Sequence, residues 1–219
     1  TIAGPIPDAL RLLDSPPLRY AQALGIEPGK AGGEASTRLS LKFPLLKTLR
    51  LDDLEILAQA SVKSLSLPKV ALGQDLDGGV LELTVDGKGL DAAGSVSLGG
   101  MPATLVLREN FSAKGAPFRS RYHLKAAAVT DEQRRRLGLD AGSFLTGPVA
   151  AYVSVTFGDG GRGDIEARLD LAPARLTLPG LGWTKEPGKP GTAEASIRLD
   201  RRQVATIPRF IVLSGDLEA

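Results

Sequence analysis

The side chains that could carry out catalysis are few, and they are scattered along the chain. Histidine occurs once, as His123, and cysteine does not occur, which excludes thiolate metal sites, disulfides and cysteine nucleophiles. The phase of His123 is opposite to that of Tyr122 and Leu124, so we expect its imidazole on the polar side of a strand. A solvated histidine explains this position more simply than a general base does.

The carboxylates and the glycine-rich segments offer no better site. Asp53 and Glu55 belong to the densest acidic cluster, but alternation places both on the polar face of one strand, without the aromatic platforms of a sugar cleft. Segments 75–79 and 158–164 lack the spacing of a calcium-binding EF-hand and are typical of hairpin turns. Neither a Gly-x-Ser-x-Gly motif nor a phosphate-binding loop occurs. The sequence therefore predicts a chain that is not an enzyme and holds no cofactor or metal ion.

Charge and hydropathy argue against a nucleic-acid-binding protein and against a membrane-spanning helix in this chain. Lys and Arg number 27 against 25 Asp and Glu, and the longest basic run is 134–136, so nucleic-acid binding is not indicated. The longest apolar run, 149–153, is far shorter than the ~18 residues of a membrane-spanning helix, and no signal peptide is recognisable. Because the chain starts at Thr1 rather than at a methionine, we expect an internal piece of a longer protein.

The elements that would position these residues are mostly strands. Apolar and polar residues alternate with the period of two that is typical of half-buried strands. This pattern covers residues 34–43, 53–63, 81–85, 122–126, 149–157, 165–171 and 197–199. Turn sequences rich in glycine, aspartate and proline separate the strands, as expected for an antiparallel meander.

Two segments predict short helices, and they reveal an internal repeat. A cap and two prolines begin the first helix, 16–24, and Thr130 and Gln133 form a capping box before the second, 131–137. The Leu-Gly step at 24–25 recurs at 137–138, and later matches follow at nearly the same offset. The sequence therefore predicts a first unit, 1–128, and a second, incomplete unit, 129–219, which share one continuous sheet.

The apolar face of so many strands must be covered by something. Periodicity alone favours a closed core, either a β-sandwich or a barrel. A third arrangement is a sheet that curls into a trough and shelters an apolar ligand.

Three stretches resemble the YhdP-like branch of the bacterial AsmA-like proteins. They are residues 12–20 leading into Leu24-Gly25-Ile26, residues 100–111, and residues 174–185. The likeness extends over most of the chain and consists of patterns of structural residues. It therefore identifies a family better than it identifies a site.

The resemblance implies a fold, a place and a partner. Members of this family have an inner-membrane helix and a long periplasmic portion of repeating β-groove units, and they are implicated in moving phospholipid between the two membranes. We therefore expect a mainly β chain, an antiparallel meander curled into a half-pipe groove with two short helices. We also expect a periplasmic segment of a protein that is anchored in the bacterial inner membrane outside this chain. Its partner would be phospholipid or another acyl-chain lipid.

The family has no catalytic residues to carry over, so the expected site is the apolar face itself. The residues expected to face lipid are Leu39, Leu41, Phe43, Leu54, Ile56, Leu81, Leu83, Val85, Leu124, Val153, Val155, Phe157, Ile165, Leu169, Ile197 and Leu199. The alternative is a structural or scaffolding module of the cell envelope, whose apolar face packs on itself and binds no ligand. A homodimer through exposed edge strands is a further expectation for the isolated chain.

Overall fold

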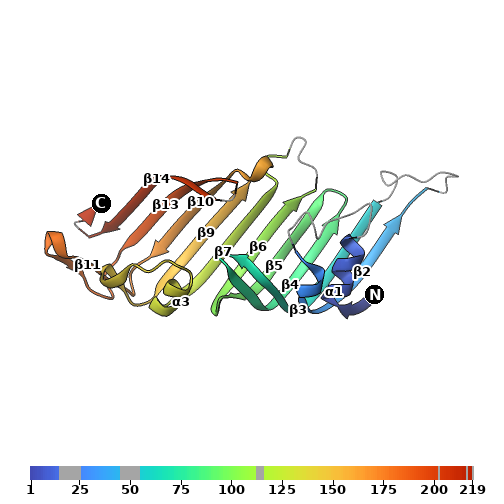
Figure 1. Cartoon of the computed structure of the whole chain (residues 1–219), viewed down its shortest axis with the longest axis horizontal. Coiled ribbons are helices and arrows are strands. Elements are labelled where there is room, and N and C mark those ends of the chain that lie inside the picture. Colours follow the sequence, from blue (N-terminus) through green and yellow to red (C-terminus); the bar gives the residue numbers. More distant parts are fainter. Residues whose placement is uncertain (15–25, 45–54, 112–115, 202, 216, 219) are drawn as a thin grey trace.

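The main body of the protein is one large antiparallel sheet. The computed structural model describes residues 1–14, 26–44, 55–111, 116–201, 203–215 and 217–218. Twelve strands follow one another in the order β1-β2-β3-β4-β5-β6-β7-β9-β10-β13-β14-β15 (Figure 1). Their bounds are Ile2–Pro5, Gly32–Lys42, Glu55–Ala71, Gln74–Asp86, Gly89–Leu98, Met101–Asn110, Ser120–Val129, Val149–Phe157, Gly163–Asp170, Thr192–Asp200, Gln203–Ser214 and Leu217–Glu218. The mainly β meander expected from the sequence is confirmed.

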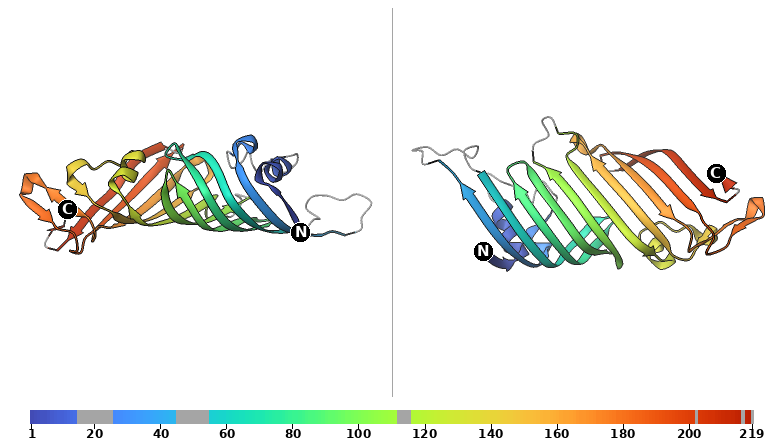
Figure 2. Two further views of the ribbon diagram at one scale, coloured as in Figure 1. Left: turned by 90° about the horizontal axis from the view of Figure 1, so that it is seen from below. Right: turned by 180° about the vertical axis from the view of Figure 1, so that it is seen from behind.

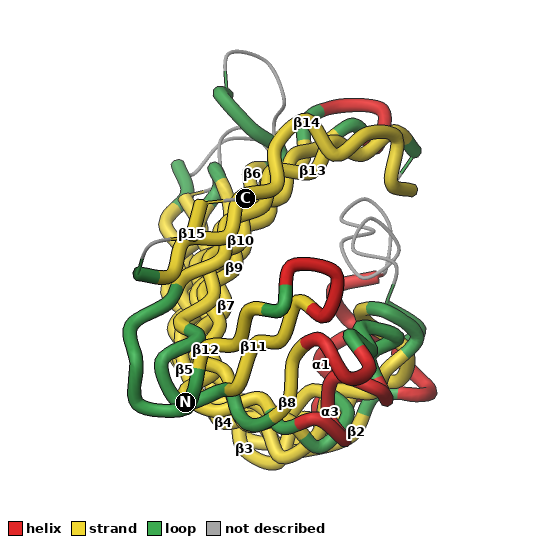
Figure 3. The backbone as a smooth tube through the Cα atoms, turned by 90° about the vertical axis from the view of Figure 1, so that its left-hand side faces the viewer, coloured by secondary structure: helices red, strands yellow, loops and turns green. Residues whose placement is uncertain are grey.

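The sheet curls but does not close. Figure 3, which looks along the molecule, shows the strands following a curve with the helices on its inner side. Among the described residues β1 pairs only with β2, and β15 pairs only with β14, so the two ends of the sheet remain apart. The closed sandwich or barrel, which periodicity alone favoured, is therefore wrong for this chain.

Short elements lie on the inner side of the curl, along one border of the sheet. They are helices α1 (Ile6–Asp14) and α3 (Asp131–Arg136), the 3-10 turns η1 (Pro28–Lys30), η3 (Gly142–Phe144) and η5 (Pro179–Leu181), and a second sheet of β8 (Leu145–Thr146), β11 (Arg175–Leu178) and β12 (Trp183–Lys185). The left view of Figure 2 shows both helices rising from the same side of the strands. We call this side of the main sheet the inner face and this border the cap border.

The opposite border consists of connections between strands and is called the turn border. It contains residues 87–88, 111, 116–119 and 158–162, the last with the 3-10 turn η4 (Asp159–Gly161), and Arg201 after β13. In Figure 1 the described parts of these connections lie above the sheet, whereas α3 lies below it. The two borders therefore differ in what covers the sheet.

Local sequence explains the described helices. The Thr130 hydroxyl accepts a hydrogen bond from the Gln133 amide at 3.3 Å, and the Gln133 side chain accepts one from the Thr130 amide at 2.9 Å. This capping box begins α3 as predicted, and the helix ends with Leu137 as its C-cap. Helix α1 was not predicted, and the expected helix 16–24 lies outside the described residues.

Two connections in the chain have the same architecture. Strands β1 and β2 are antiparallel neighbours joined through α1, and β7 and β9 are antiparallel neighbours joined through α3. Each connection reaches its second strand through a glycine with a positive φ, Gly33 at 111° and Gly147 at 92°. These glycines correspond in the sequence repeat. The division into units 1–128 and 129–219 itself stays a prediction.

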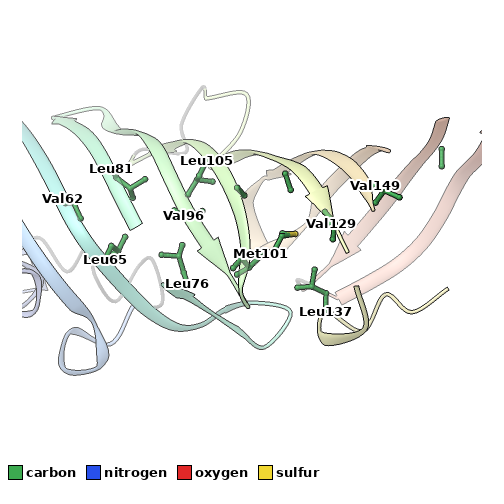
Figure 4. Packing of buried hydrophobic residues seen from close by; sticks show 14 of the residues in the cluster. Val62, Leu65, Leu76, Leu81, Val96, Met101, Leu105, Val129, Leu137 and Val149 are labelled. Atoms are coloured by element: carbon green, nitrogen blue, oxygen red, sulfur yellow. The ribbon is translucent and has the colours of Figure 1, made fainter. Parts of the chain in front are cut away.

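The buried core is a strip along the cap border. Leu76, Met101, Val129, Leu137 and Val149 belong to one cluster of buried side chains, and Figure 4 shows them on the inner face. The chain exposes 13614 Å² of surface, whereas a compact monomer of 22.9 kDa exposes about 9,600 Å². A single curled layer with a narrow core accounts for this large surface.

Candidate functional site

The strand register aligns the inner face into three continuous lines of residues. Line A, nearest the turn border, is Leu39, Ala58, Val85, Leu90, Glu109, Ser120, Phe157, Gly163, Leu199 and Val204. Line B is Thr37, Ala60, Leu83, Ala92, Leu107, Tyr122, Val155, Ile165 and Ile197. Line C is Ala35, Val62, Leu81, Gly94, Leu105, Leu124, Val153, Ala167, Ala195 and Phe210. Cross-strand neighbours share a face, so each line is one surface.

Protein covers the three lines unevenly. Next to the caps, Leu81 of line C is 4% exposed, whereas Leu39 at one end of line A is 44% exposed and Phe210 of β14 is 64% exposed. Val85, Val155 and Ile165 of lines A and B are half-buried, whereas Glu109 and Ser120 in the middle of line A are buried. Buried side chains thus form a strip along the cap border, and lines A to C beside it are mostly half-buried.

The residues expected to face lipid come together on this face, with two exceptions. Line A contains Leu39, Val85, Phe157 and Leu199, line B contains Leu83, Val155, Ile165 and Ile197, and line C contains Leu81, Leu124 and Val153. Leu41 pairs with Ile56 beside line A, and Leu169 lies beside line C. Phe43 follows the end of β2 and is exposed, and Leu54 lies outside the described residues. Contact with lipid stays a prediction for all of them.

The sequence did not reveal several residues of the same face. Leu90 begins the alternating strand β5, but the small residues Ala92 and Gly94 that follow weaken its apolar phase. Leu105 and Leu107 flank Val106, which lies on the other face and hides the alternation. Cross-strand pairing, rather than hydropathy along one strand, identifies these positions.

Glu109 interrupts the apolar surface of line A. It is the one charged residue of the three lines, and it is only 4% exposed. The Ser120 hydroxyl donates to one carboxylate oxygen at 2.7 Å, and the Tyr122 hydroxyl donates to the other at 2.6 Å. These charge-assisted bonds compensate for the water that the carboxylate loses. The Tyr122 ring meets Phe157 edge to face, with 6.3 Å between centroids, so the cluster is fixed on both sides.

The outer face of the sheet is polar. Arg209 forms an ion pair with Glu194 at 3.1 Å, and the Lys125 ammonium lies 5.3 Å from the centre of the Tyr152 ring. A shallow depression of about 460 Å³ crosses these strands and includes His123, which is exposed on this face as its phase predicted. Its charged side chains are mixed in sign, and the Ser196 hydroxyl donates a hydrogen bond to the Glu166 carboxylate at 2.7 Å.

Two buried cations hold the caps to the sheet. The Arg134 guanidinium, 6% exposed, donates to the carbonyls of Val129 at 2.9 Å, Gly147 at 2.8 Å and Leu145 at 3.2 Å. It also pairs with Asp131. One side chain therefore ties α3 to the ends of β7 and β8 and to the entry of β9.

Lys185 has the same role at the base of the small sheet. Its ammonium donates to the carbonyls of Ala174 at 2.7 Å, Glu186 at 3.2 Å and Ala172 at 3.3 Å. Desolvation by burial lowers the pKa of Lys185, although the carboxylates of Asp170 and Glu186 act in the opposite direction. Both cations are engaged by backbone carbonyls, so neither is available to a ligand.

The described residues contain no group of three histidine and acidic side chains that could hold a metal ion. In the same part of the chain, no helix combines the length and the apolar character needed to cross a bilayer. Comparisons of the chain with protein-family models, with curated proteins and with solved structures found no match. The site must therefore be interpreted from its own geometry.

Proposed function

We propose that the inner face binds the acyl chains of phospholipid and forms part of a path along which lipid moves between two membranes. The observation that carries this proposal is the continuity of lines A, B and C across nine or more strands, with most of their apolar side chains only half-buried by the protein. Apolar surface that a chain does not cover itself is typical of a binding surface.

The energetics favour a lipid chain on this face. Removing one CH₂ group from water is worth about 0.8 kcal/mol, so a diacyl lipid gains several kcal/mol along a few strands. The side chains of lines B and C are almost all Leu, Ile, Val and Ala, with Thr, Gly, Tyr and Phe between them. A surface of such uniform chemistry binds a chain about equally well at each position. It therefore suits a conduit better than a carrier with one deep pocket.

The resemblance to AsmA-like proteins supports the same proposal and adds a location. It implies a periplasmic chain, within a protein that is anchored in the inner membrane by a segment outside the chain. Shielding acyl chains from water is the task that such a crossing requires. In that setting the chain is a segment of the lipid path rather than the whole path.

A scaffolding module with a self-packed apolar face is the second candidate. Its apolar face would be covered by the chain itself. In the described residues the caps cover only one border, and line A remains half-buried or exposed over most of its length. This uneven cover favours the lipid-binding surface over the scaffold.

Neighbouring residues on opposite faces allow a sharp test. A photocrosslinking residue at Ile56 or Val153 points to the inner face, and the same residue at Leu57 or Tyr152 points to the outer face. The chain is expressed in the bacterial periplasm, irradiated, and analysed for covalently bound phospholipid by mass spectrometry. We expect lipid adducts at Ile56 and Val153 only. Adducts at none of the four positions, with no lipid in an organic extract, would refute the proposal.

A further inference from the structure

The connections at the turn border share a feature that the lipid path alone does not explain. Between β4 and β5, β6 and β7, β9 and β10, and β13 and β14, each connection carries a basic residue. These residues are Lys88, Arg119, Arg162 and Arg201, which we call the cationic rim. None of them forms an ion pair with a carboxylate among the described residues. The rim is therefore a row of basic residues without an ion pair among the described residues.

Carboxylates lie near the rim, but none forms an ion pair with a rim cation among the described residues. The Asp86 carboxylate accepts hydrogen bonds from the amides of Lys88 at 2.8 Å and Gly89 at 2.9 Å, so it is engaged by its own turn. Asp164 stands opposite Arg198 in the strand register, and Asp200 directly precedes Arg201 in the chain. Arg119 donates to a backbone carbonyl, that of Phe111, at 3.1 Å. The charge of the rim thus remains available.

The rim adjoins line A of the inner face. Val85 and Leu90 of line A flank the turn that contains Lys88, and Leu199 lies two residues before Arg201. A lipid with its chains on lines A to C would place its polar end at this border. The cap border offers no such exit, because α1, α3 and the small sheet cover it.

We propose that the cationic rim binds the phosphate of the glycerophospholipid whose acyl chains occupy the inner face. This inference rests on the proposed function and adds the polar half of the ligand to it. Three of the four cations are exposed, and a guanidinium can bind phosphate through two parallel hydrogen bonds. Two strands separate successive connections, which spaces the cations about 10 Å apart along the rim. A phosphate that dissociates from one cation can therefore bind the neighbouring one.

The test compares two lipids that differ only in the phosphate. Phosphatidylcholine vesicles carry a labelled phosphatidic acid or a labelled diacylglycerol with the same two acyl chains. The purified chain is incubated with each vesicle, re-isolated, and assayed for bound label. The rim variant replaces all four cations with glutamine (Lys88→Gln, Arg119→Gln, Arg162→Gln, Arg201→Gln).

A matched variant controls for net charge. It removes four exposed outer-face cations that form no ion pair with a described residue (Arg38→Gln, Lys63→Gln, Lys125→Gln, Arg198→Gln). The preference is the ratio of bound phosphatidic acid to bound diacylglycerol. We expect this ratio to fall about three- to tenfold in the rim variant and to stay unchanged in the matched variant. The preference of the unaltered chain should also fall as salt is raised, because exposed charges are screened.

Three other results would overturn either the proposed function or the inference about the rim. If neither lipid binds the unaltered chain, the proposed function fails and the rim inference fails with it. If both lipids bind and the rim variant keeps its preference, the inference about the rim is wrong while the lipid-binding face stands. Equal losses in the rim variant and the matched variant would assign the effect to net charge and would also overturn the inference.

Discussion

At the scale of single residues, the inner face contains one position that depends on its neighbours for hydrogen bonds. The Glu109 carboxylate is buried in an apolar line, and the hydroxyls of Ser120 and Tyr122 supply the hydrogen bonds that water would otherwise give. A buried charged group that loses a partner costs more than an ordinary hydrogen bond contributes. Removing a single donor oxygen atom beside Glu109 should therefore lower the free energy of unfolding of the chain.

Replacing Tyr122 with phenylalanine removes one donor and leaves the ring in place. We expect Tyr122→Phe to lower the free energy of unfolding by about 1.5–3 kcal/mol. Urea denaturation followed by circular dichroism measures the change. Tyr152→Phe is the control, because its ring is exposed on the outer face, and it should change stability by less than about 0.5 kcal/mol. Equal effects would show that the bond to Glu109 does not stabilise the fold.

Asp86 gives a prediction that depends on pH. The backbone hydrogen bond from Lys88 lowers the pKa of Asp86 below its usual value of 3.8, with smaller support from Gly89 and Arg108. A lowered pKa means that the ionised carboxylate stabilises the folded chain above 3.8, and that this contribution is lost as the pH falls through the folded pKa.

Asp86→Asn keeps an acceptor oxygen in the turn but removes its charge. We expect this variant to be less stable than the unaltered chain at pH 7 and equally stable once the pH is well below 3.8. Thermal denaturation of both proteins across this range measures the difference. A stability gap that does not change with pH would show that charge at Asp86 has no part in it.

At the scale of elements, the caps depend on cations that bind backbone carbonyls. Arg134 in α3 donates to the carbonyls of Val129 in β7, Leu145 in β8 and Gly147 at the entry of β9. Arg135, its neighbour on the helix, is exposed. The two arginines therefore form a natural pair for comparison.

Arg134→Met keeps the length of the side chain but leaves the three carbonyls unsatisfied. We expect it to lower the free energy of unfolding by about 2–3 kcal/mol, and Arg135→Met to change it by less than about 0.5 kcal/mol. Hydrogen exchange should locate the loss of protection in α3 and in the first residues of β9. If the two variants are equally stable, Arg134 does not hold the cap to the sheet.

The sequence predicted these elements to different degrees. Alternation predicted the strands over 34–43 and 149–157, because large apolar residues repeat there with a period of two. It missed β5, whose inner positions include Ala92 and Gly94, and it missed α1, which has prolines at its start. Whether the sheet curls or closes depends on contacts between distant strands. Hydropathy along the chain cannot predict those contacts, and for that reason it favoured a closed core.

At the scale of the whole molecule, the two faces of a single layer can be altered separately. A charge on the inner face should abolish lipid binding without unfolding the sheet, because lines A to C are only partly covered by protein. We expect Val153→Asp and Ile56→Asp to lose co-purified phospholipid, and to block transport when they are placed in the intact parent protein. Tyr152→Asp and Leu57→Asp change the outer face and should keep the lipid. Circular dichroism confirms that all four variants fold, and lipid bound to the inner-face variants would contradict the proposal.

The order of the strands has a consequence for how the protein is made. From β1 to β7 each strand pairs with the strand that the chain supplies next, and β7, β9 and β10 continue this order. Loop closure is inexpensive when partners are close in sequence, so each hairpin can join the sheet soon after it leaves the ribosome or the translocation channel. The sheet can therefore assemble from its N-terminal end while the remainder is still being synthesised. Its growing apolar surface is open to lipid from the beginning.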